Sequence, residues 1–227
     1  ELRSERAATE TIVIATNHLL DLLTPSQTNS LRSDVFSNEW RNWQNTEIYR
    51  EESGLRLSEV SAPIRDTILK IIEISLSQKG YEKTRNVMRL NGFLGELVGG
   101  PLIFGEFTYL FNLYGEPSLS EPWGWQIDGH HLVINYFVLG DQVVMSPVFI
   151  GSEPVHAITG RFRGTSVMQQ EQNKGFALVA SLTDEQKKEA ILSTSKLGNN
   201  ALAQAYQDNL DLDYAGIPAE RLNEKQK

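Results

Sequence analysis

The segment Leu132–Leu139 constrains the fold more than any other part of the chain. Its residues are mostly aromatic or β-branched, which is typical of a strand, and apolar side chains fall on both of its faces. We therefore expect helices or a second sheet to cover both of its sides. Gly140-Asp141 then predicts a two-residue hairpin turn, because a type II′ turn takes glycine at its first central position. Folding back from this turn gives the expected pairs Leu139–Gln142, Phe137–Val144, Asn135–Ser146 and Val133–Val148.

Helical patterns flank this hairpin on both sides. The pattern of apolar and polar residues predicts helices over residues 8–23, 63–80, 81–98, 168–178, 184–196 and 201–208. Gly92 and Gly95 each cost the third of these helices about 1 kcal/mol relative to alanine, which suggests either close packing against its backbone or an early end to the helix. A second strand is predicted over 107–113.

Glycine separates the helical parts from the middle of the chain, since 12 of the 17 glycines lie between residues 84 and 164. We therefore expect one domain over residues 1–227, helical over 1–98, β-rich over 99–164 and helical again over 165–227. The predicted fold class is α+β, with an antiparallel β-sheet core covered by several α-helices.

A helix-start pattern recurs three times, as an apolar residue, a capping residue, two further residues and then glutamine. It occurs at Leu23–Gln27, at Leu182–Gln186 and at Leu222–Gln226. The third copy stands one residue before the end of the chain. From this pattern we expect the chain to be the N-terminal part of a longer protein. The missing C-terminal segment of the same protein would then be a partner of the chain.

Composition excludes several classes of protein. With 21 basic and 29 acidic residues the net charge is −8, which argues against nucleic-acid binding. The absence of cysteine excludes disulfides and thiolate chemistry, and no apolar run is long enough to cross a membrane. We expect a cytoplasmic protein, with an exported origin left open because residue 1 is Glu1 rather than Met.

The richest cluster of chemical groups runs from Glu116 to His131 and contains two Trp, a Gln, an Asp and two His. Imidazole can act as a base or a metal ligand near neutral pH, and tryptophans beside glycine can form flat pocket walls. The expected catalytic residues are His130, His131 and Glu116, and the expected substrate-binding residues are Trp123, Trp125 and Gln126. A divalent metal (Zn, Fe or Mn) would be held by His130 and His131.

One geometric argument limits this interpretation. In a regular strand His130 and His131 would point to opposite faces, so both could serve one site only if Gly129 formed a bulge. Otherwise one histidine is functional and the other holds a neighbouring loop. The companion residues that could complete a site are Glu106, Glu116, Asp128, Glu153 and His156. The competing interpretation is that the tryptophans and histidines pack the core.

These residues lie in segments that resemble a known family, the domain-of-unknown-function family 3500. The similar segments are Gly115–Ser118, Glu121–Leu132 and Pro147–Pro154, and the Trp-Gly-Trp and Gly-His-His elements are the most specific. The resemblance implies a considerably longer protein, whose continuation would contain a further His-x-His element and acidic residues. It implies no established reaction.

The sequence therefore gives two functional hypotheses. The first is a hydrolase or lyase that acts on a small-molecule ligand through a His-centred site, with or without a metal. The second is a non-catalytic small-molecule-binding or scaffold module in which the Trp/His cluster is structural.

Overall fold

The computed structural model describes residues 5–47, 53–194, 206 and 214–227. The chain divides into two compact units, Glu1–Val167 and Met168–Lys227. Each unit is described by itself below.

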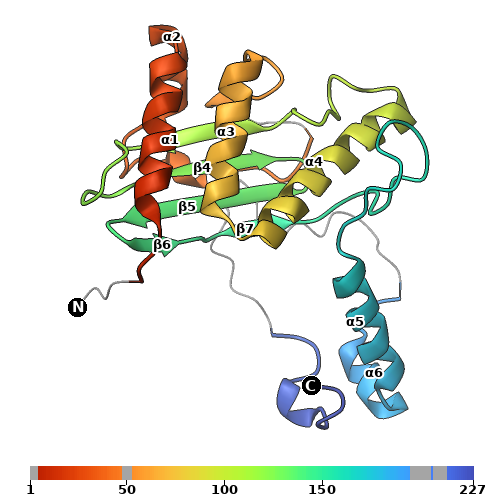
Figure 1. Ribbon diagram of the computed structural model, residues 1–227. Helices are drawn as coiled ribbons and strands as arrows, with labels where there is room; N and C mark the ends of the chain where they lie inside the picture. Colours follow the sequence, from red (N-terminus) through yellow and green to blue (C-terminus); the bar gives the residue numbers. More distant parts are fainter. Residues whose placement is uncertain (1–4, 48–52, 195–205, 207–213) are drawn as a thin grey trace. The chain divides into compact units, whose positions relative to one another are not determined.

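A seven-stranded sheet forms the centre of the first unit (Figure 1). Its strands are β1 (Arg32–Ser33), β2 (Leu55–Arg56), β3 (Leu110–Tyr114), β4 (Trp123–Gly129), β5 (Leu132–Leu139), β6 (Gln142–Val144) and β7 (Val148–Ile150). The main order is β1-β3-β4-β5-β6, while β2 pairs with β3 and β7 pairs with β5. The β1–β3 pair is parallel and the other pairs are antiparallel.

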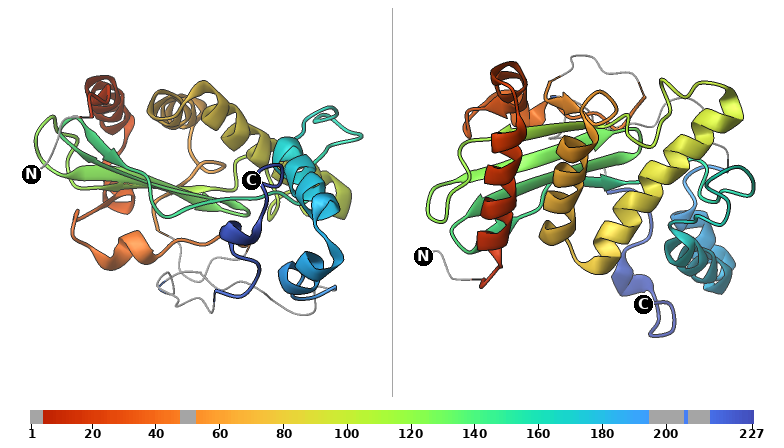
Figure 2. Two further views of the ribbon diagram at one scale, coloured as in Figure 1. Left: turned by 90° about the horizontal axis from the view of Figure 1, so that it is seen from below. Right: turned by 45° about the horizontal axis from the view of Figure 1, so that its top comes forward.

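Three helices lie across one face of this sheet: α1 (Thr9–Leu22), α3 (Ala62–Ser75) and α4 (Gln78–Val98) (Figures 1 and 2). Each follows a predicted apolar stripe, so the α+β prediction is confirmed. The short helix α2 (Pro25–Leu31) contacts β2 and β3. It begins with the capping box that the sequence predicts, between Thr24 and Gln27. Among the described residues, no helix is both long and apolar enough to cross a membrane.

The opposite face of the sheet is covered by the 3₁₀ helix η1 (Asn38–Arg41) and the segment that follows it. A Cβ added to Gly124 of β4 would lie 2.8 Å from the Trp40 ring. Because side chains alternate along a strand, Trp123, Trp125 and Ile127 point to the helical face. The sheet is therefore buried on both faces, but its second face is covered by η1 and an irregular segment rather than by the α-helices or second sheet expected from the sequence.

The glycines of α4 mark close contacts with its backbone. A Cβ on Gly92 would lie 2.7 Å from the Phe162 ring, and one on Gly95 would collide with the carbonyl oxygen of Phe104. The loop between α4 and β3 therefore packs directly on the last turns of the helix. This confirms the interpretation of both glycines as packing positions.

The hairpin register is as predicted up to Val144, which pairs with Phe137. Beyond that point the prediction is wrong by one residue, since Val133 pairs with Phe149 and Ile134 with Val148. The Asn135 amide donates to the carbonyl of Pro147 rather than to that of Ser146. Pro147 has no amide hydrogen to donate, so the ladder is interrupted before it and resumes at β7.

The strand predicted over 107–113 is shorter at its start, because β3 begins at Leu110.

The second unit contains α5 (Gln169–Ser181), α6 (Asp184–Ala190) and the 3₁₀ helix η2 (Ala219–Arg221).

Capping boxes are confirmed at two positions in the second unit. One joins Thr183 and Gln186 at the start of α6. The same two hydrogen bonds join Asn223 and Gln226, where the chain forms a turn. The helix predicted to reach residue 196 ends at Ala190, and the described residues after it, 191–194, are not helical. Apart from Tyr206, the helix predicted over 201–208 lies outside the described residues.

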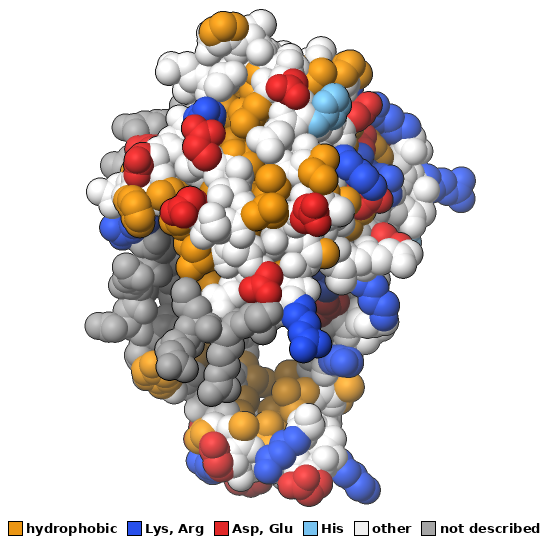
Figure 3. All heavy atoms as spheres, turned by 60° about the vertical axis from the view of Figure 1, so that its left-hand side comes forward, with side chains coloured by type: hydrophobic (Ala, Val, Ile, Leu, Met, Phe, Trp, Pro, Cys, Tyr) orange, Lys and Arg blue, Asp and Glu red, His pale blue; other side chains and the backbone are white. Residues whose placement is uncertain are grey.

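Acidic, basic and apolar side chains are interspersed on the face shown in Figure 3. This distribution agrees with the ordinary charged fraction of the sequence, 22%.

Candidate functional site

The cluster that runs from Glu116 to His131 spans the full length of β4 and is divided between two ends of the sheet. Glu116 follows β3 beside the start of β4, whereas His130 and His131 follow the end of β4. Seven residues of strand separate these ends by roughly 20 Å. The structure therefore does not bring Glu116 to the histidines, and Glu116 forms an ion pair with Arg32 instead.

Both expected pocket-wall tryptophans are fully buried on the helical face of the sheet. The Trp123 indole N–H donates to the carbonyl of Ser118 at 2.9 Å. The Trp125 ring stacks on Tyr136 with the ring centroids 4.9 Å apart and an interplanar angle of 8°. These contacts form the hydrophobic core beneath the helices.

Gln126 points to the other face, where its side chain joins three segments. Its Nε2 donates to the carbonyl of Trp40 at 3.0 Å and to Asn135 Oδ1 at 2.6 Å, and its Oε1 accepts from the Tyr114 hydroxyl. Trp40 also stacks on Tyr114, with the centroids 3.8 Å apart. Gln126 thus fixes η1 to the sheet.

The two histidines form the β4–β5 turn, between the paired residues Gly129 and Leu132. The strand alternation expected for them does not apply, because neither is a strand residue. His131 has a φ of 62°, in the left-handed region, and the two imidazole centroids lie 4.0 Å apart. Both rings therefore belong to one site without a bulge.

The backbone of this turn holds neighbouring loops in place. The His131 amide donates to the carbonyl of Asn45 at 3.0 Å, and its carbonyl accepts from the Gly151 amide at 2.8 Å. The carbonyl of His130 accepts from the buried Tyr109 hydroxyl at 3.0 Å.

The hydrogen bonds of Asn91, on α4, assign the tautomer of His130. Asn91 Nδ2 donates to the carbonyl of Gly105 at 2.9 Å and to the Thr108 hydroxyl, so Asn91 Oδ1 must be the atom that faces His130. His130 Nδ1 lies 2.8 Å from this oxygen and therefore has the hydrogen. The lone pair of the neutral ring is then on Nε2.

Burial and the neighbouring His131 lower the pKa of His130 to about 4, although the carboxylates of Glu47 and Glu153 oppose this shift. His130 is consequently neutral at pH 7. A neutral imidazole with Nδ1–H bonded to an amide oxygen presents Nε2 as a fixed acceptor.

Comparison with known proteins gives one match. The model of the family described as "Protein of unknown function (DUF3500)" matches residues 5–227. The chain belongs to the DUF3500 family. No curated protein and no solved structure matches it.

The companion residues expected around the DUF3500 histidines have different surroundings. Glu153 Oε2 lies 3.8 Å from His131 Nε2. Glu106 forms a mostly buried ion pair with Arg85 at 2.7 Å. His156 pairs with Ser166 in an isolated β-bridge. Glu153 is thus the expected companion whose carboxylate the structure places against this histidine pair.

Asp128 lies two residues before His130 and points to the face covered by the segment after η1. It is almost completely buried, and its Oδ2 accepts from the Gln44 amide at 3.0 Å. Burial raises the pKa of Asp128 to about 8, against the opposing effects of the Gln44 hydrogen bond and of Arg56. Asp128 is therefore protonated at pH 7.

The described part of the chain contains no group of three His, Asp or Glu side chains placed to hold a metal ion.

Sequence reasoning missed Asn91, although a signal for it was present. Asn91 stands among apolar residues on the buried face of α4, and a buried amide requires hydrogen-bond partners. Phe104, whose ring centroid lies 5.2 Å from that of His130, was also missed, because it comes from a loop without a periodic pattern.

Proposed function

We propose that this protein is an enzyme of the hydrolase or lyase type, and that it acts on a small organic molecule at the β4–β5 turn. The observation that supports this proposal is the 2.8 Å contact between His130 Nδ1 and Asn91 Oδ1. It leaves Nε2 of a neutral ring as the proton acceptor. In a hydrolase Nε2 would accept a proton from the attacking water, and in a lyase it would accept one from a C–H group of the substrate.

Asn91 is the positioning residue of this site. Its three hydrogen bonds join α4, the loop before β3 and the imidazole, so the ring cannot turn without breaking them. A positioned general base contributes about 10²–10⁴-fold to a rate, most when its pKa lies near the working pH, so the lowered pKa of His130 places it at the low end of this range. His131, with Glu153 at 3.8 Å, supplies a second imidazole beside the reacting atoms.

The tryptophans and Gln126 have a supporting role in this proposal. Trp125 and Trp123 fill the core under β4, and Gln126 fixes the opposite face. They would hold the turn rigid rather than contact the substrate.

A metal-dependent version is the second candidate, and one observation favours it. Histidines that ligate metals usually donate their other ring N–H to an oxygen acceptor, as His130 does to Asn91. A divalent Zn, Fe or Mn ion on His130 and His131 would supply a hydroxide at neutral pH. Elemental mass spectrometry of untagged protein distinguishes this version, since it requires stoichiometric metal that is lost in His130→Ala.

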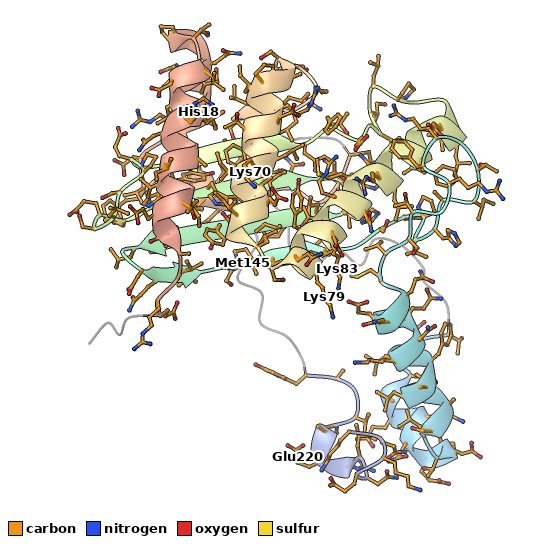
Figure 4. The ribbon with its side chains drawn as sticks, viewed as in Figure 1. His18, Lys70, Lys79, Lys83, Met145 and Glu220 are labelled. Carbon is orange, nitrogen blue, oxygen red and sulfur yellow. The ribbon has the colours of Figure 1, made fainter. Side chains whose placement is uncertain are left out.

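Turnover assays test the proposal directly. A panel of p-nitrophenyl esters reports hydrolysis, and a panel of 3-hydroxy acids reports elimination of water through the absorbance of the unsaturated product. We expect activity that falls at least about 100-fold in His130→Gln, with little change in Tm. His18→Gln is the matched control, because His18 is exposed on α1 (Figure 4).

The non-catalytic alternative predicts a different pattern. If the Trp/His cluster is structural, His130→Gln lowers Tm by several degrees and neither panel shows turnover above that of buffer.

A further inference from the structure

A cavity of about 730 Å³ lies in the first unit at the end of the sheet opposite to His130. Its walls come from α2, from the segment that contains β1, and from the turn that follows β3. Its volume is in the range of small-molecule sites, roughly 300–1,000 Å³. This cavity is independent of the function proposed for His130.

Two opposite charges lie side by side on its wall. Arg32 Nη2 and Glu116 Oε1 are in direct contact, and their side chains are 31% and 69% exposed. An ion pair as exposed as this contributes little to stability, so a ligand can replace either partner at low cost. Arginine also binds carboxylates through two parallel hydrogen bonds.

The remaining wall is polar on one side and apolar on the other. Asp34 adds a second carboxylate, which makes the formal charge of the lining −1, while Leu23 and Pro25 are apolar. A ligand with only a negative charge would be repelled by the two carboxylates of this cavity, and a ligand with only a positive charge would be repelled by the guanidinium. A ligand with both charges satisfies both groups.

We propose that this cavity binds a free α-amino acid with an apolar side chain. The carboxylate of the ligand pairs with Arg32, its ammonium group pairs with Glu116, and its side chain contacts Leu23 and Pro25. An α-amino acid fits because its two charges are attached to one carbon, and the charges of Arg32 and Glu116 are adjacent in the same way.

Saturation-transfer NMR and calorimetry with L-leucine test this proposal on the full chain. We expect leucine to bind. Leucinamide, which lacks the carboxylate, and N-acetyl-leucine, which lacks the ammonium group, should each bind at least about tenfold more weakly, because each loses a charge-assisted contact. Arg32→Gln and Glu116→Gln should each weaken leucine binding by a similar factor.

Lys70→Gln is the matched control, because Lys70 forms an exposed ion pair with Glu73 on α3 (Figure 4). It should leave leucine binding unchanged, and circular dichroism should show that all three variants are folded. The proposal is overturned if leucine gives no signal, if leucinamide binds as tightly as leucine, or if both Arg32→Gln and Glu116→Gln bind leucine like the unchanged protein.

Discussion

Asp128 is buried at the end of β4 and His130 is half-buried in the turn that follows, and burial shifts their pKa values in opposite directions. The pKa of Asp128 rises to about 8 and that of His130 falls to about 4. Both are neutral at pH 7 for the same reason, since burial penalises the charged form of each group. The end of the sheet beneath the β4–β5 turn therefore has no formal charge from these two side chains.

The raised pKa of Asp128 predicts a pH-dependent stability. Between an unfolded pKa of about 3.9 and the folded value of about 8, the folded state keeps a proton that the unfolded state has released. The contribution is therefore complete below the lower value and is lost as the pH rises through the upper one. The free energy of unfolding should fall by at most about 1.4 kcal/mol per pH unit in this window.

Asp128→Asn should remove this slope, because the amide oxygen still accepts from Gln44 and the side chain does not ionise. Urea denaturation at pH 5, 6, 7 and 8 should show the variant gaining stability relative to the unchanged protein as the pH rises. The effect of His130 cancels in this comparison. A difference that is constant with pH contradicts the assignment, and Asp66→Asn, on the exposed side of α3, controls for loss of a surface charge.

At the scale of secondary-structure elements, the glycines of two helices provide a matched pair. Gly95 of α4 lies against the Phe104 carbonyl, whereas a Cβ on Gly175 of α5 would meet nothing within 4 Å. We expect Gly95→Ala to destabilise the protein by about 1–3 kcal/mol through overpacking. Gly175→Ala should be neutral or stabilise α5 by up to about 1 kcal/mol.

Thermal unfolding followed by far-ultraviolet circular dichroism checks both variants. Equal effects of the two substitutions would show that Gly95 is not a packing position.

The helices and the first half of the β5 hairpin could be predicted because their determinants are local. Apolar spacing defined α1, α3 and α4, and Gly140 defined the turn and the pairing of Val144 with Phe137. The pairing beyond Pro147 could not be predicted, because the length of an interruption in a strand depends on the contacts around it.

The candidate site was predicted less completely, for two physical reasons. Residues that are close in sequence along β4 lie at opposite ends of a strand, so Glu116 and His130 are far apart. Conversely, Asn91 is distant in sequence from His130 and meets it only through the packing of α4 on the sheet. The Gly-His-His element lies at the β4–β5 turn. The two histidines are turn residues, so the alternation of side chains along a strand does not describe their positions.

At the scale of the whole molecule, the described hydrophobic core is concentrated in Glu1–Val167. In the described part of Met168–Lys227, Leu182 is the one buried apolar residue. We expect a fragment of residues 1–167 to fold with an unfolding temperature within a few degrees of that of the full chain.

All four tryptophans, at positions 40, 43, 123 and 125, report on the core of this fragment. Their near-ultraviolet circular dichroism should match that of the full chain. A fragment that lacks this signal, while the full chain has it, would show that the core requires residues after Val167.

The central claim is that His130 is neutral and presents Nε2 as an acceptor because Asn91 binds Nδ1–H. A long-range ¹H–¹⁵N correlation spectrum of the imidazoles, recorded from pH 4 to pH 8 and assigned with His130→Gln, tests it most directly. We predict a hydrogen on Nδ1, none on Nε2, and no protonation of His130 until the pH approaches about 4. In Asn91→Ala this tautomer preference should be lost. A hydrogen on Nε2 at pH 7, or a titration midpoint near the ordinary value of about 6.5, would contradict the claim.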